Sequence, residues 1–131
     1  MDDKTQTPRL FRLNVEVGDL DRAAQFYGEL LGQEARIQMG ARFYLDAGGV
    51  TLQVVQVESP HPAAKALYFA VADLEEYHRR CSKLGWLSTE LVHGTPAGAP
   101  VVRPWGERSF YADDPWGNPL CFVDEGTIYA G

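Results

Sequence analysis

The sequence predicts an α+β fold in which one βαβββ unit is written twice. Three observations predict it: a strand pattern runs into an aspartate, an amphipathic helix follows and ends at a glycine, and the same signals return in the same order. Residues 17–21 (Val-Gly-Asp-Leu-Asp) match residues 71–75 (Val-Ala-Asp-Leu-Glu), so Asp19 and Asp73 hold equivalent places.

The first unit opens with a strand at residues 10–17, where apolar and polar side chains alternate. Asp19 is the expected N-cap of a helix, and Gly32 is the residue that ends it. The apolar stripe of this helix is formed by Leu20, Ala23, Ala24, Tyr27, Leu30 and Leu31. Strands are then expected at about 34–38, 41–46 and 50–57, with turns at Gly40 and at Gly48-Gly49.

The second unit repeats this order from a strand at residues 66–71. Asp73 is again the expected N-cap, now with Glu76 completing a capping box, and Gly85 ends the helix. The helix stripe is formed by Leu74, Tyr77, Cys81 and Leu84. Strands are expected at about 86–92, 108–112 and 120–123, and the first two are separated by a long loop rich in proline and glycine.

We therefore expect residues 1–131 to form one domain. Unit one spans about 9–57, a linker containing Pro60 and Pro62 spans 58–65, and unit two spans about 66–124. The two cysteines, Cys81 and Cys121, are too few for a disulfide framework, and the assignments place them on opposite sides of one sheet.

Charge and hydropathy exclude several classes of partner. A net charge of −6 and a pI near 4.9 argue against nucleic acid, which requires clustered Lys and Arg. The longest apolar run, residues 66–72, is far shorter than the ~20 residues that span a bilayer. The chain does not open with an export signal, so we expect a cytoplasmic protein that contacts no membrane.

Three passages resemble the vicinal oxygen chelate superfamily, which includes glyoxalase I, extradiol dioxygenases, fosfomycin-resistance enzymes and bleomycin-resistance proteins. They are residues 17–32, the repeat at 71–74, and residues 114–120, which begin Asp-Pro-Trp-Gly-Asn and which we interpret structurally as only a turn. The resemblance covers about residues 10–124. It implies curled mixed sheets with helices on their convex side, the glyoxalase/bleomycin resistance fold, and a homodimer.

Metal-dependent members of this superfamily place one ligand on the first strand and one on the last strand of each unit. The resemblance maps these positions to Arg12, Gln53, Ala66 and Cys121. Arginine is a permanent cation and alanine has no donor atom, so we expect no metal and no other cofactor. The histidines His61, His78 and His93 are all out of ligand register.

The cleft of the fold supplies the remaining candidates for ligand binding. If the odd-numbered residues of the first strand face the helix, the cleft receives Arg12, Asn14 and Glu16, and by the same phase Ala66, Tyr68 and Ala70. An arginine on a strand is, however, more often a surface residue. The other candidates are Gln53, Trp105, Arg108, Tyr111, Trp116 and Cys121.

Each of these further candidates has a chemical role and a plainer alternative. Trp105 and Trp116 would stack on a planar or cationic group, but they are equally suited to core or dimer contacts. Arg108 would clamp a carboxylate. Cys121 has no visible histidine partner, which favours a buried inert thiol over a nucleophile.

The sequence thus favours a glyoxalase/bleomycin-resistance-like protein that binds a small organic molecule in its cleft without a metal. The alternative is a metal-dependent lyase or dioxygenase of the same superfamily, with ligands other than those assigned. Acid–base chemistry without a metal, with Glu16 or Glu107 as the base, is a third possibility. The identity of the ligand and the presence of catalysis stay open at this point.

Overall fold

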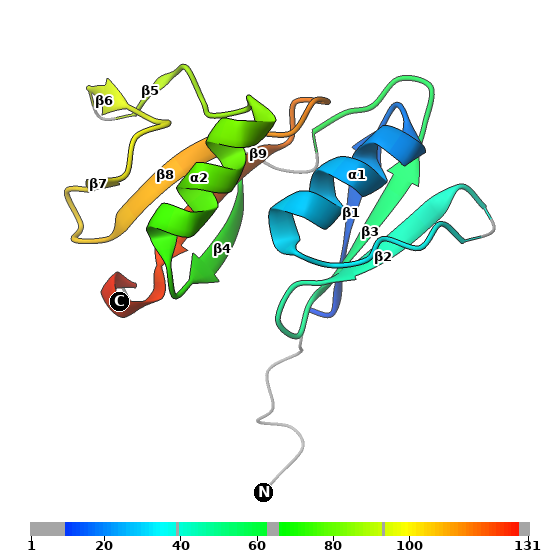
Figure 1. Ribbon diagram of the computed structural model, residues 1–131, viewed down its shortest axis with the longest axis horizontal. Coiled ribbons are helices and arrows are strands. Elements are labelled where there is room, and N and C mark those ends of the chain that lie inside the picture. Colours follow the sequence, from blue (N-terminus) through cyan, green and yellow to red (C-terminus); the bar gives the residue numbers. More distant parts are fainter. Residues whose placement is uncertain (1–9, 39, 63–65, 93, 129–131) are drawn as a thin grey trace, which may run out of the picture.

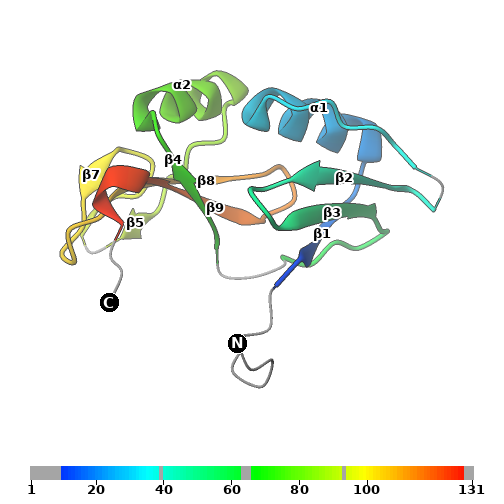
Figure 2. The ribbon, with the colours of Figure 1, turned by 90° about the horizontal axis from the view of Figure 1, so that it is seen from below.

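The computed structural model describes residues 10–38, 40–62, 66–92 and 94–128, and it contains two sheets that lie side by side (Figure 1). Both helices occupy one layer and the strands of both sheets lie in a second layer beneath them (Figure 2). The elements are β1 (Arg12–Val17), α1 (Leu20–Leu31), β2 (Arg42–Asp46), β3 (Thr51–Gln56), β4 (Leu67–Val71), α2 (Leu74–Leu84), β5 (Leu91–Val92), β6 (Thr95–Pro96), β7 (Val101–Val102), β8 (Arg108–Asp113), β9 (Pro119–Asp124) and the 3-10 turn η2 (Glu125–Thr127). The predicted α+β class is confirmed.

The two sheets share one topology, as the sequence repeat predicts. The first sheet has the order β1-β3-β2 and the second has the order β4-β9-β8-β7. In each unit the first strand runs parallel to the last one, and the last strand pairs antiparallel with the strand before it. Each curled sheet is covered by its own helix on one face, which leaves the opposite face of both sheets without a helix (Figure 2).

The helix boundaries follow the predicted caps. Asp19 accepts a hydrogen bond from the Arg22 amide at 3.1 Å, and Asp73 accepts one from the Glu76 amide at 3.2 Å. The C-caps are the predicted glycines 32 and 85, with φ values of 66° and 82°. The second half of the predicted capping box is wrong, because the Glu76 carboxylate binds the side chains of Arg79 and Arg80 on the next turn.

One expected strand is reduced to a single bridge, and another is reduced to a bridge and a two-residue strand. In place of a strand at 34–38 the chain has one bridge, Gln38 to Arg42, and Ile37 is 48% exposed, so no apolar face holds this segment against the sheet. In place of a strand at 86–92 there is one bridge at Leu87 and the short β5. Two segments bind the backbone of Tyr111 in β8, which leaves little room for one continuous strand. The Ser88 amide donates to the Tyr111 carbonyl, and the Tyr111 amide donates to the Ala97 carbonyl.

The core is one apolar cluster that runs beneath both helices. Alternate residues of β1, β2 and β3 face α1, and alternate residues of β8 and β9 face α2, while Cys81 faces the sheet from α2. The fully buried large side chains include Tyr27, Phe43, Phe110 and Phe122. Neither helix in the described residues is long and apolar enough to cross a membrane.

The turn at residues 114–118 ties unit two to unit one. Asp114 is completely buried and accepts hydrogen bonds from the amides of Trp116 and Asn118 at 2.9 and 2.8 Å. Its other oxygen accepts from the Tyr27 hydroxyl of α1 and from Asn118 Nδ2, both at 2.7 Å. Asn118 Nδ2 also contacts the Glu16 carbonyl at 3.2 Å. The interpretation of this segment as only a turn is therefore wrong, because the turn also joins the two halves.

The buried Tyr27–Asp114 bond generates a prediction for stability. Tyr27→Phe should lower the free energy of unfolding by about 1–3 kcal/mol, because it leaves a buried carboxylate oxygen short of one donor. Urea denaturation measures this, with Tyr77→Phe as the control that removes a hydroxyl from a ring stacked on Phe122. Equal losses in the two variants would show that the Asp114 bond adds nothing specific.

Candidate functional site

The faces of the two sheets that carry no helix hold most of the predicted site residues; we call this surface the helix-free face. Val15 and Val17 are fully buried beneath α1, so alternation turns Arg12, Asn14 and Glu16 to the other side of β1. In unit two, Leu67 and Val71 are buried, and Tyr68 and Ala70 lie on the same helix-free face. The structure thus places these residues where the phase of the sequence predicts.

The centre of unit one is a polar row that crosses three strands. Asn14 of β1 pairs in register with Gln53 of β3, which pairs with Tyr44 of β2. Gln53 Nε2 donates to Asn14 Oδ1 at 2.6 Å, and Gln53 is 8% exposed. This contact leaves the Asn14 amide nitrogen and the Gln53 amide oxygen to interact with another group.

Arg12 lies beside this row and leans across the sheet. Its guanidinium carbon is 5.1 Å from the centre of the Phe11 ring and 5.7 Å from the centre of the Tyr44 ring. Both distances are within the range of cation–π contacts. Phe11 and Tyr44 remain 55% and 39% exposed, so the aromatic pair and the cation form an accessible surface.

The equivalent row of unit two consists of Tyr68 of β4, Cys121 of β9 and Tyr111 of β8, which are in register. Burial, and after it the interactions with Tyr68 and Cys121, raise the pKa of the Tyr111 hydroxyl. Burial raises the pKa of the Cys121 thiol to about 11, even though Tyr111, Ser109 and the Arg103 charge act to lower it. Cys121 is therefore a neutral thiol near pH 7.

Arg103, which the sequence did not single out, is the buried cation of this half. It is 2% exposed, its Nε donates to Ser109 Oγ at 3.0 Å, and its Nη1 donates to Thr95 Oγ1 at 3.2 Å. Its guanidinium carbon is 5.4 Å from the centre of the Tyr111 ring. In the sequence Arg103 lies in a proline-rich loop without periodicity, so only the pairing of β7 with β8 reveals its place.

Three predicted site residues do not join these rows. Arg108 faces α2 and forms an ion pair with Glu75, because it shares the phase of the buried residues Phe110 and Ala112. Trp105 lies in the turn before β8 and donates to Glu107 Oε1 at 2.8 Å.

The third is Trp116, which packs where the two units meet. A Cβ atom placed on Gly18 would lie 2.9 Å from the indole nitrogen of Trp116, and Arg22 lies over the indole ring at 5.7 Å. The two polar rows therefore do not include Arg108, Trp105 or Trp116.

The resemblance maps the metal ligands of the superfamily to Arg12, Gln53, Ala66 and Cys121, which we call the corner positions. These residues do not suit a divalent cation. Arg12 brings a positive charge and Ala66 brings no donor, so the four positions offer at most the Cys121 thiol and the Gln53 amide oxygen, which are too few for a metal site. Among the described residues, no group of three His, Cys, Asp or Glu side chains is spaced to hold a metal ion.

The histidines and the two candidate bases have other roles. His78 Nε2 lies 3.0 Å from the Gly98 carbonyl, and the His61 amide donates to Glu16 Oε1 at 2.9 Å. Glu107 accepts from Trp105. His93 lies outside the described residues.

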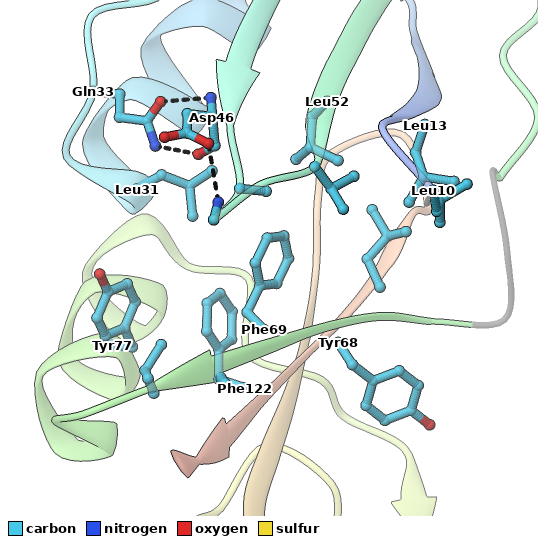
Figure 3. A pocket seen from close by; sticks show the side chains of 16 residues that line it. Leu10, Leu13, Leu31, Gln33, Asp46, Leu52, Tyr68, Phe69, Tyr77 and Phe122 are labelled. Atoms are coloured by element: carbon cyan, nitrogen blue, oxygen red, sulfur yellow. Dashed lines mark hydrogen bonds between the residues drawn. The ribbon is translucent and has the colours of Figure 1, made fainter. Parts of the chain in front are cut away.

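Apart from the helix-free face, the structure has a hollow between the two units, on their helix side (Figure 3). This inter-unit cleft encloses about 660 Å³, and its walls are mostly apolar. At one rim Gln33 exchanges two hydrogen bonds with the backbone of Asp46, at 2.6 and 2.9 Å, while Tyr68 points away from the cleft (Figure 3). The apolar wall includes Leu13, Leu31, Leu52, Leu67, Phe69 and Phe122.

A smaller hollow of about 380 Å³ borders the second row at Tyr111. It is also lined by Glu90 and Asp113. Burial raises the pKa of the Asp113 carboxyl, and the negative charges of Glu90 and Asp114 add to this effect.

Comparison with known proteins places this geometry in a family. The model of the Glyoxalase/Bleomycin resistance protein/Dioxygenase superfamily matches residues 9–122, nearly the whole chain. No curated protein has a significant sequence match to the chain.

Solved structures with the same fold include proteins of different kinds. An oxidase, ChaP-H2, superposes with a TM-score of 0.75 at 24% identity, covering 96% of this chain and 98% of its own. A bleomycin resistance determinant encoded on the transposon Tn5 has a TM-score of 0.67 at 24% identity, and the match covers 89% of this chain and 98% of the determinant. A bleomycin-binding protein complexed with bleomycin has a TM-score of 0.65 at 23% identity, and the match covers 90% of this chain and 98% of that protein. At these identities the likeness establishes the fold alone.

The burial of the thiols predicts their reactivity. Iodoacetamide at pH 8 should modify Cys121 in the native protein about 100-fold more slowly than in urea, because the raised pKa lowers the thiolate fraction. Cys81, whose pKa burial raises to about 12, should be slower still. Mass spectrometry of the alkylated peptides measures both rates. Fast native labelling of Cys121 would mean that the second row is open and ionised.

The raised pKa values of the thiols also determine how the stability of the fold depends on pH. Below about pH 7 the thiols are protonated in the folded and unfolded chain alike. Between about pH 9 and 11 the unfolded chain loses these protons while the native thiol of Cys121 keeps its own, so stability should fall as pH rises. Denaturation of Cys121→Ala should show a weaker decline over that window.

Proposed function

The chain belongs to the Glyoxalase/Bleomycin resistance protein/Dioxygenase superfamily, and from that premise we propose that it binds a small organic molecule on its helix-free face without a metal. The observation that carries this proposal is that a cation, two amides and an aromatic ring lie together where metal-dependent members of the superfamily would carry metal ligands. Arg12 stands at one corner position, and the neighbouring row offers the amide groups of Asn14 and Gln53 beside the Tyr44 ring.

The two polar rows suit a ligand with an aromatic part and a polar part. Tyr44 and Tyr68 are exposed aromatic rings, and Tyr68 is 65% exposed. Amide and phenol groups beside them provide directional hydrogen bonds, which fix the orientation of a ligand that rings hold by stacking. One neighbour in fold is a bleomycin-binding protein complexed with bleomycin, which supports ligand capture as a use of this scaffold.

A second copy of the chain would enclose the ligand. The helix-free faces of both sheets lie on the same side of the molecule, so neither face covers the other (Figure 2). Leu10, Phe11 and Tyr68 are each more than half exposed there or beside it. Large exposed apolar side chains of this kind mark interaction surfaces. We therefore include a homodimer in the proposal.

The metal alternative, a lyase or dioxygenase of the same superfamily, is tested by metal content. We expect well under one equivalent of Ni, Zn, Fe or Mn per chain in protein purified without chelator, and no change in Gln53→Ala. Elemental analysis of the wild type and the variant measures this. Stoichiometric metal that disappears in Gln53→Ala would establish the alternative.

Ligand binding itself is tested with a neutral planar probe. Adding 2-naphthamide should give saturable amide shifts in ¹⁵N NMR spectra at the two polar rows, and EDTA should not change them. Shifts confined to the residues of the inter-unit cleft would place the binding surface elsewhere. Analytical ultracentrifugation of the same sample tests the homodimer, and a monomer at all concentrations would remove that part of the proposal.

A further inference from the structure

We propose that Arg12 and its aromatic neighbours recognise the carboxylate of a planar aromatic acid. This inference rests on the proposed function and narrows its ligand class. It depends on how Arg12 is held, on which acids surround it, and on which donors lie beside it.

Arg12 is held in place by rings. The guanidinium lies over both Phe11 and Tyr44, one from its own strand end and one from β2 across the sheet. Contacts with ring faces do not use the N–H groups as hydrogen-bond donors. They restrict a long side chain before a ligand arrives, so less conformational entropy is lost on binding.

Two acids of this face in unit one, Glu16 and Asp46, are engaged by other groups. Within the described residues, no carboxylate forms an ion pair with Arg12. Glu16 accepts from the His61 amide at 2.9 Å, and Asp46 Oδ1 accepts from the Gly48 and Gly49 amides at 3.0 and 3.4 Å. The exposed positive charge of Arg12 is thus partnered by rings and not by a carboxylate, so its N–H groups can bind an added anion without first breaking an ion pair.

The residue next to Arg12 on the same face supplies a second donor. Asn14 follows two positions along β1, so its side chain projects in the same direction. Because Asn14 Oδ1 accepts from Gln53, the Asn14 Nδ2 group is the part that faces another partner. A carboxylate that takes the two-pronged bond from Arg12 can accept from Asn14 Nδ2 while its ring stacks beside Tyr44.

The charge of the whole chain disfavours ligands that carry several negative charges. The net charge is −6, so multiply charged phosphates are repelled over long range, whereas one carboxylate meets one arginine. A guanidinium also matches the flat carboxylate group better than an ammonium does. The ligand class is therefore a planar aromatic monoacid.

The experiment compares 2-naphthoate with 2-naphthamide, which have the same ring system and differ in charge. In NMR titrations the wild type should bind the acid about tenfold more tightly than the amide. The preference should shrink at high salt, because an exposed charge pair is screened. Equal dissociation constants for the two probes would overturn the inference.

Two substitutions at Arg12 assign the preference to this residue. Arg12→Gln should remove the preference, so that the acid and the amide bind with similar dissociation constants, and Arg12→Lys should restore only part of the preference because an ammonium lacks the planar fork. A preference that survives in Arg12→Gln would also overturn the inference. Dispersed NMR spectra of both variants establish that they are folded.

The matched control is Arg22→Gln. Arg22 also lies over an aromatic ring, that of Trp116, but it belongs to α1 and not to the helix-free face. This variant should keep the full preference for the acid. If 2-naphthamide binds to the polar rows without any preference for the acid, only this inference fails; if neither probe binds there, the proposed function fails with it.

Discussion

The buried carboxylate of Asp114 is the group on which the arrangement of the two units depends. It accepts hydrogen bonds from its own turn through Trp116 and Asn118, and from α1 of the other unit through Tyr27. A carboxylate without contact to water is stable only when donors surround it. Because those donors come from both units, the turn and α1 must meet in one orientation.

That orientation determines which surfaces can bind anything. The helices α1 and α2 lie in one layer, the inter-unit cleft lies on that side, and both sheets present their other faces in the same direction (Figure 2). The repeated topology then places two equivalent rows on the helix-free face, one of amides and a phenol, the other of two phenols and a thiol.

The two rows differ in their charge and in how accessible their cations are. Unit one carries an accessible cation held between rings, whereas the cation of unit two, Arg103, is buried and bound to Ser109 and Thr95. The thiol of Cys121 is protonated and enclosed. The chain therefore combines the fold of the superfamily with a helix-free face that carries a cation, aromatic rings, amides and a thiol.

Local signals in the sequence determined the helix caps Asp19 and Asp73 and the glycines that end both helices. They also determined the strand phase that turns Arg12, Asn14 and Tyr68 away from the helices. Both features depend only on neighbours in the chain. The sequence also predicted strands at 34–38 and 86–92, but the structure keeps only one bridge in the first and one bridge with the short β5 in the second, since pairing needs an edge that the sequence does not show. Only the tertiary structure decided that Arg108 turns to Glu75, that Arg103 becomes the buried cation, and that Asp114 joins the units. Each of these depends on partners distant in the sequence or on a register between strands, which no local pattern encodes.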